Sequence, residues 1–162
     1  MKKDEKITAL KNAMRGEVDS VNVYKNALSS AKDPQIISFF QNMVEEEQNH
    51  YNYLLEYYHS INNEEKLQKI NTADAENQIF SQQFMERIGA NQILFSAISV
   101  ATLLEKEAFE FYKKSAAKTD DEVLKKFFLT LADWEQEHYD NLLEISKQAE
   151  LTYWQKNRFE PF

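Results

Sequence analysis

Two glutamate-histidine pairs interrupt otherwise apolar stripes in strongly helical segments, and this feature narrows the folds that the chain can adopt. In each stripe the members recur at steps of three and four residues, the spacing of one buried face of an α-helix. The first stripe consists of Ile36, Phe40, Met43, Glu47, His50, Leu54 and Tyr57. The second consists of Leu124, Phe128, Leu131, Glu135, His138, Leu142 and Ile145. Both pairs are therefore predicted to point into a helical core.

The second stripe repeats the first at an offset of 88 residues, the distance from Glu47 to Glu135. Fourteen positions between Ala13 and Glu56 are identical to their counterparts at this offset. They make up about a third of the span, more than helical composition alone would give. The chain is therefore predicted to contain two duplicated helical hairpins related by an approximate two-fold axis. With a long crossover between them, they form an all-α, ferritin-like four-helix bundle.

The scarcity of turn residues supports an all-helical fold, since the chain has only two glycines and two prolines. We predict a single domain over residues 1–162, with long helices at about 4–31, 34–60, 92–118 and 121–156. Asp33 before Pro34, and Asp121 at the equivalent position, are typical helix-start signals. The crossover, 61–91, is longer than an ordinary helix–helix link. A short amphipathic helix is predicted within it, ending near Gly89 and burying Ile79, Phe80, Phe84, Met85 and Ile88.

Charge and composition restrict the partners and the chemistry. The formal net charge of −8 argues against nucleic acid and against an anionic membrane surface as partners. No apolar run is long enough to span a bilayer and no secretory signal is recognisable, so the cytoplasm is the expected location. The 162 residues contain no cysteine, which excludes disulfides, thiolate nucleophiles, iron–sulfur clusters and rubredoxin-type iron within them.

Counting from the turns places four glutamates in the middle of the bundle. Glu17 and Glu47 each lie about 15 residues from a turn near Lys32, so both sit about 22 Å from it along antiparallel helices. The same count around Asp120 sets Glu105 opposite Glu135. The two-fold axis then brings four carboxylates and two imidazoles to one buried site.

The alternative is that these carboxylates reach the surface or pair with lysines. Burying four unpaired carboxylates would cost several kcal/mol each, more than the ~5–15 kcal/mol that stabilises a whole domain. Two divalent cations would neutralise them, and carboxylate oxygens with one imidazole per ion suit iron or manganese better than structural zinc. The Glu-x-x-His spacing alone is weak evidence, because Glu56 and His59 share it on the opposite, solvent-facing side of the same helix.

The combined pattern resembles the di-iron domain of rubrerythrins, within the ferritin-like superfamily, over nearly the whole chain. It consists of Glu17 followed by Tyr24, Glu47-x-x-His50, Glu105 followed by Tyr112, and Glu135-x-x-His138. The resemblance implies two iron ions, or manganese or a mixed pair. It implies Glu47 and Glu135 as bridging ligands, Glu17 and Glu105 as terminal ligands, and His50 and His138 bound to one metal each.

Two departures from the family pattern affect the expected chemistry. Rubrerythrins typically have a further glutamate where this chain has Ala108, and they usually carry a cysteine-rich rubredoxin domain that supplies electrons. The resemblance therefore implies an oxidoreductase that reduces hydrogen peroxide or dioxygen with an external electron-donor protein. A ferroxidase or iron-storage role of the bacterioferritin type and a non-catalytic metal site remain alternatives. A homodimer is compatible with the sequence.

Residues beside the proposed ligands have open roles at this stage. The hydroxyls of Tyr24 and Tyr112 would donate hydrogen bonds to ligand carboxylates, or else the two rings only pack in the core. Trp134 is interpreted as packing. Glu45 and Glu46 lie outside the apolar stripe and are interpreted as solvated surface.

Overall fold

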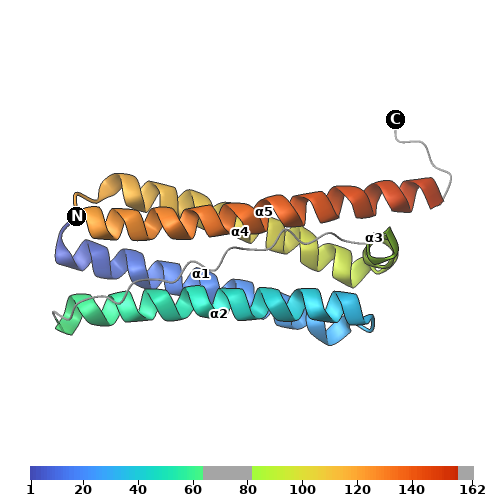
Figure 1. The fold of residues 1–162 in the computed structure, drawn as a ribbon, viewed down its shortest axis with the longest axis horizontal. Coiled ribbons are helices and arrows are strands. Elements are labelled where there is room, and N and C mark those ends of the chain that lie inside the picture. Colours follow the sequence, from blue (N-terminus) through green and yellow to red (C-terminus); the bar gives the residue numbers. More distant parts are fainter. Residues whose placement is uncertain (64–81, 157–162) are drawn as a thin grey trace.

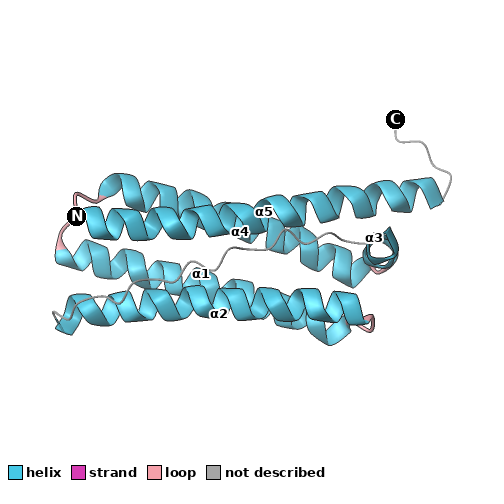
Figure 2. Cartoon of the chain, in the orientation of Figure 1, coloured by secondary structure: helices cyan, strands magenta, loops and turns pink. Residues whose placement is uncertain are grey.

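The computed structural model describes residues 1–63 and 82–156, and within these ranges it consists of five α-helices without a strand (Figures 1 and 2). They are α1 (Lys3–Ser30), α2 (Pro34–Asn63), α3 (Gln82–Ala90), α4 (Gln92–Lys118) and α5 (Glu122–Lys156). The long helices pair as α1 with α2 and α4 with α5, and α1 also packs along α4. The predicted all-α, ferritin-like bundle of two hairpins is confirmed.

The same aspartate position starts the second helix of each hairpin. Asp33 Oδ1 accepts hydrogen bonds from the backbone N–H groups of Gln35 and Ile36, at 3.0 and 3.3 Å. Asp121 Oδ1 does the same for Val123 and Leu124. These bonds satisfy donors that the first turn of a helix leaves free. The predicted start signals are therefore confirmed.

The other oxygen of each cap aspartate holds a cation from a different element. Asp33 Oδ2 pairs with Arg87 of α3. Asp121 Oδ2 lies 2.6 Å from Lys6 Nζ of α1, and this hydrogen bond lowers the pKa of Asp121. Each cap aspartate thus starts its own helix and ties another helix to its end of the bundle.

The core is divided into two apolar clusters. One contains Tyr24, Ile36, Phe40, Ile98 and Ile145. The other contains Leu10, Tyr112, Leu124, Phe128 and Leu131. Both clusters draw residues from the α1–α2 hairpin and from the α4–α5 hairpin. The buried polar residues discussed below lie between the two clusters.

Helix α3 turns across the end of the bundle and packs chiefly against α5. Its buried residues are Phe84, Met85 and Ile88, three of the five predicted for the helix in the crossover. Ile79 and Phe80, the other two, lie outside the described residues. The helix ends at Ala90, one residue after the predicted glycine.

Replacing Gly89 with alanine is expected to destabilise the protein by about 1–3 kcal/mol, through overpacking. A Cβ at this position would lie 2.6 Å from the carbonyl oxygen of Ala149, a backbone atom of α5 that cannot move aside alone. Gly16 is the matched control, because a Cβ there meets nothing within 4 Å. Gly16→Ala should instead raise stability by about 0.5–1 kcal/mol. Thermal unfolding of both variants measures the effect, and an unchanged or raised melting temperature for Gly89→Ala would refute the tight contact.

No single helix among the described residues is long and apolar enough to cross a membrane. The segments Gln83–Ala90 and Gln92–Lys118 pass that test together, by length and composition only, and are bent by 98° relative to each other.

Candidate metal centre

The six residues predicted as metal ligands lie together between the two apolar clusters, and all six are buried. Each long helix contributes at least one of them. They are Glu17 of α1, Glu47 and His50 of α2, Glu105 of α4, and Glu135 and His138 of α5. Glu47 and Glu135 are called the central glutamates below, and Glu17 and Glu105 the outer glutamates. Their assignment as metal ligands stays a prediction.

Each imidazole directs its Nδ1 atom toward both central glutamates and toward the outer glutamate of its own hairpin. His50 Nδ1 lies 2.9 Å from Glu135, 3.4 Å from Glu47 and 3.7 Å from Glu17. His138 Nδ1 lies 2.9 Å from Glu47, 3.6 Å from Glu135 and 3.8 Å from Glu105. One ligand atom from each of the central glutamates and histidines falls within 4.8 Å of the others. The arrangement follows the two-fold axis predicted from the repeat.

Seven buried side-chain atoms of this cluster have no hydrogen-bond partner among the described residues. They are both carboxylate oxygens of the central glutamates, Oε2 of Glu105, and Nδ1 of His50 and His138. The Nδ1 atoms approach the carboxylates to ion-pair distance without the alignment of a hydrogen bond. Buried polar atoms are rarely left in this state in a folded protein. Carboxylate oxygens and imidazole nitrogens that face one another without partners fit a binuclear metal site, with a donor set suited to iron or manganese.

Without a metal ion, protons must offset the negative charge of the cluster. Burial, together with repulsion from the central glutamates, raises the pKa of both outer glutamates well above its usual value. Burial by itself would lower the pKa of the histidines, but the charges and close polar contacts of the surrounding glutamates together outweigh it and raise the pKa of His50 and His138. Both ligand types therefore hold their protons strongly, and metal binding must displace those protons.

The pKa values of the two central glutamates are lowered instead of raised. Burial and their mutual repulsion tend to raise the pKa of Glu47, yet the nearby imidazoles lower it. For Glu135, burial again acts to raise the pKa, but the charge of His50 together with the close polar contacts of both imidazoles outweighs burial and lowers the pKa. The two central carboxylates therefore stay ionised between two protonated imidazoles. Charged carboxylates in the middle of the site are the form that binds cations.

Two tyrosines connect the hairpins through the outer glutamates. The Tyr24 hydroxyl on α1 donates to Glu105 Oε1 on α4 at 2.5 Å. The Tyr112 hydroxyl on α4 donates in the same way to Glu17 Oε1 on α1. Burial, together with the neighbouring carboxylates, raises the pKa of both hydroxyls, so they remain donors. The hydrogen bonds expected from the sequence are present, and their service to metal ligands stays a prediction.

Glu46 and Trp134 contact the site in a way that the sequence analysis missed. Glu46 was assigned to the surface and its side chain is 45% exposed, yet its Oε2 atom lies 3.0 Å from Nε2 of His138. The Trp134 ring stacks on His50, with ring centroids 5.0 Å apart. The sequence feature that points to these two contacts is position, since each residue directly precedes a central glutamate.

The other Glu-x-x-His pair lies away from the centre. Glu56 and His59 are both exposed on α2, as the sequence predicted. Ala108, at the position of the additional family glutamate, is partly buried against an apolar cluster.

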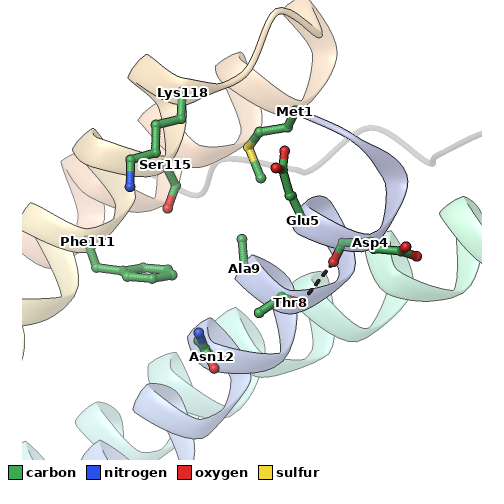
Figure 3. Close-up of a pocket in the computed structure, with 9 residues that line it drawn as sticks. All are labelled: Met1, Asp4, Glu5, Thr8, Ala9, Asn12, Phe111, Ser115 and Lys118. Atoms are coloured by element: carbon green, nitrogen blue, oxygen red, sulfur yellow. Dashed lines mark hydrogen bonds between the residues drawn. The ribbon is translucent and has the colours of Figure 1, made fainter.

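A separate groove of about 670 Å³ lies between α1 and α4, toward the N-terminal end of α1 (Figure 3). Its lining shares no residue with the cluster of glutamates and histidines. The lining residues are Met1, Asp4, Glu5, Thr8, Ala9, Asn12, Phe111, Ser115 and Lys118. The groove is therefore separate from the cluster of glutamates and histidines.

A four-helix bundle with a central cluster of four glutamates and two histidines defines the class of ferritin-like carboxylate proteins with a binuclear metal site. The rubrerythrin family model matches residues 8–146 of this sequence, so the chain belongs to the rubrerythrin family. No curated protein and no solved structure matches the chain. Within the 162 residues there is no cysteine that could form a rubredoxin-type iron site.

Proposed function

We propose that the protein is a di-iron oxidoreductase that reduces hydrogen peroxide or dioxygen, with electrons from a separate donor protein. The proposal is supported chiefly by the seven buried ligand-type atoms without hydrogen-bond partners. Membership in the rubrerythrin family supports iron as the metal. A structural role alone would need only closed coordination, whereas carboxylate-rich sites can leave positions open for a small oxidant.

The side chains of the centre have distinct proposed roles. The central glutamates would bridge two ions, and each outer glutamate with its histidine would complete the coordination of one ion. The hydrogen bonds from Tyr24 and Tyr112 fix the orientation of the outer glutamates. Two iron(II) ions bound here would supply the two electrons that, with two protons, convert hydrogen peroxide to two water molecules.

The electron donor is proposed to lie outside these 162 residues, because they contain no cysteine. A cysteine-ligated iron centre, the usual relay of the family, therefore cannot form from these residues. A homodimer and a cytoplasmic location stay predictions, and nucleic acid and membranes are not proposed as partners.

Anaerobic loading with iron(II), followed by rapid mixing with hydrogen peroxide or dioxygen, tests this function. We expect a single fast oxidation, equivalent to about two iron ions per chain. Sustained peroxide consumption should begin only when a rubredoxin and its reductase are added. Optical absorption follows the iron, and a peroxide electrode follows turnover.

Other outcomes would contradict the proposal in different ways. Retention of hundreds of iron ions per assembly, or a shell-sized particle in solution, would identify iron storage. A reduced centre inert to both oxidants would leave a non-catalytic metal site.

A further inference from the structure

Positions 46 and 134 break the two-fold symmetry of the metal centre. They are equivalent in the repeat, since each directly precedes a central glutamate. One carries a glutamate and the other a tryptophan. Each side chain contacts the histidine of the opposite hairpin, Glu46 with His138 and Trp134 with His50. The two halves of the site therefore share their glutamates and histidines. They differ in the residue that contacts each histidine from the opposite hairpin.

Glu46 contacts the nitrogen of His138 that points away from the carboxylates of the centre. The ring places Nδ1 toward the carboxylates of the centre and Nε2 at 3.0 Å from Glu46 Oε2. When a metal ion displaces the proton on Nδ1, the proton that remains on Nε2 is donated to Glu46 and the Nδ1 lone pair faces the ion. A carboxylate in this place fixes the tautomer and the ring orientation, and makes the imidazole a stronger ligand.

Among the described residues, His50 has no carboxylate in the place that Glu46 takes at His138. All carboxylates that lie within 4.0 Å of His50 in the described part of the chain are at its Nδ1 atom. The indole of Trp134 stacks on the face of the His50 ring, with an interplanar angle of 8°. Stacking fixes the plane of the ring, but an indole offers no acceptor for an Nε2 proton.

We propose that Glu46 is a positioning residue that makes the two metal positions unequal, so that the position at His138 fills first and the position at His50 second. The inference rests on the proposed binuclear centre, but not on its reaction with peroxide or dioxygen. Two equivalent positions would also fill in two steps, because two nearby cations repel each other. Filling in two steps is therefore no evidence for the proposal. The test is which position fills first and whether that order depends on Glu46.

Calorimetric titration of the full metal-free chain with cobalt(II) measures both binding events. Glu46→Gln is expected to weaken binding of the first ion by about 10–100-fold, the usual cost of losing such a partner. Glu45→Gln is the matched control, since it removes the same charge from the neighbouring exposed position. Its first-ion affinity should stay within about threefold of the unmodified chain. Equal affinities for Glu46→Gln and the unmodified chain would overturn the inference.

A double-mutant cycle shows whether Glu46 acts through His138. In a His138→Ala background, Glu46→Gln should cause little further loss of affinity, because its partner is already gone. His50→Ala should abolish the second event and leave the first in place. A loss of the same size from Glu46→Gln with and without His138 would reveal a general charge effect and refute the positioning role.

Trp134 provides the reciprocal test. Trp134→Glu restores the carboxylate at the equivalent position and should strengthen binding of the second ion by about tenfold or more. Trp134→Phe retains an aromatic ring and should change neither event. Circular dichroism verifies that both variants are helical. A folded Trp134→Glu protein with unchanged second-ion affinity would contradict the assigned inequality.

The titration of the unmodified chain separates this inference from the proposed function. Absence of cobalt binding would refute the binuclear centre and the inference together. Binding of two ions with no response to Glu46→Gln would refute the inference alone.

Discussion

Removal of the metal ions is expected to lower the melting temperature by about 10 °C or more. A site with free metal a thousandfold above its Kd stabilises the folded state by about 4 kcal/mol, and 1 kcal/mol shifts the melting temperature by about 2–4 °C at this size. Metal-free protein must also hold four carboxylates among apolar clusters. Differential scanning calorimetry of chelated and reloaded samples measures the shift.

The two forms should also respond to pH in opposite directions. In the metal-free form, the pKa values of His50, His138 and both outer glutamates are raised. A raised pKa contributes stability that is fully present below the unfolded-state value and is lost as pH rises through the folded-state value. Metal-free protein should therefore lose stability as pH rises above the usual pKa values, which are 4.5 for the outer glutamates and 6.5 for the histidines. Metal affinity should increase over the same range, because fewer protons compete for the ligands.

Equal melting temperatures with and without metal at neutral pH would contradict a buried metal site. Parallel pH responses of the two forms would show that protons and metal ions do not share the cluster. The Gly16→Ala variant, in which the added Cβ meets nothing within 4 Å, should show the same metal-dependent shift as the unmodified chain.

Loss of a single ligand should reduce metal binding severely. Glu47→Ala removes a carboxylate that faces both imidazoles, and His138→Ala removes one of the two imidazoles predicted to bind metal. We expect a loss of affinity larger than the ~10–100-fold that accompanies loss of an outer partner. Metal content after gel filtration and calorimetric titration both report it.

Glu56→Ala and His59→Ala are the matched controls for the ligand variants. Their spacing on α2 equals that of Glu47 and His50, but both side chains are exposed. Neither substitution should change metal content. Loss of metal on changing His59 would mean that the wrong face of α2 was assigned to the centre.

The sequence allowed the inner residues of the site to be predicted because their positions obey two independent regularities. Helical spacing put Glu47 and His50 in a buried stripe, and the repeat supplied their counterparts in the other hairpin. Counting from the turns then brought the four glutamates to one level. These arguments need only periodicity, and helices obey periodicity closely.

The outer contacts could not be predicted by the same reasoning. Glu46 lies off the buried stripe, and periodicity therefore assigns it to solvent. Its contact with His138 depends on how the two hairpins pack side by side. The periodicity of a single helix contains no information about that packing. Gly89 is similar: the sequence indicated a helix end there, while its close approach to Ala149 depends on the angle at which α3 crosses α5.

The crossed bonds from Tyr24 to Glu105 and from Tyr112 to Glu17 have a consequence for folding. Apolar clusters tolerate a sliding of one helix along another, since one leucine can replace the next in a contact. A slip of one turn, about 5.4 Å, would break both tyrosine bonds at once and leave the outer glutamates buried without donors. The alignment of the two hairpins is thereby selected by hydrogen bonds, so the register of the predicted metal ligands is set without a metal ion.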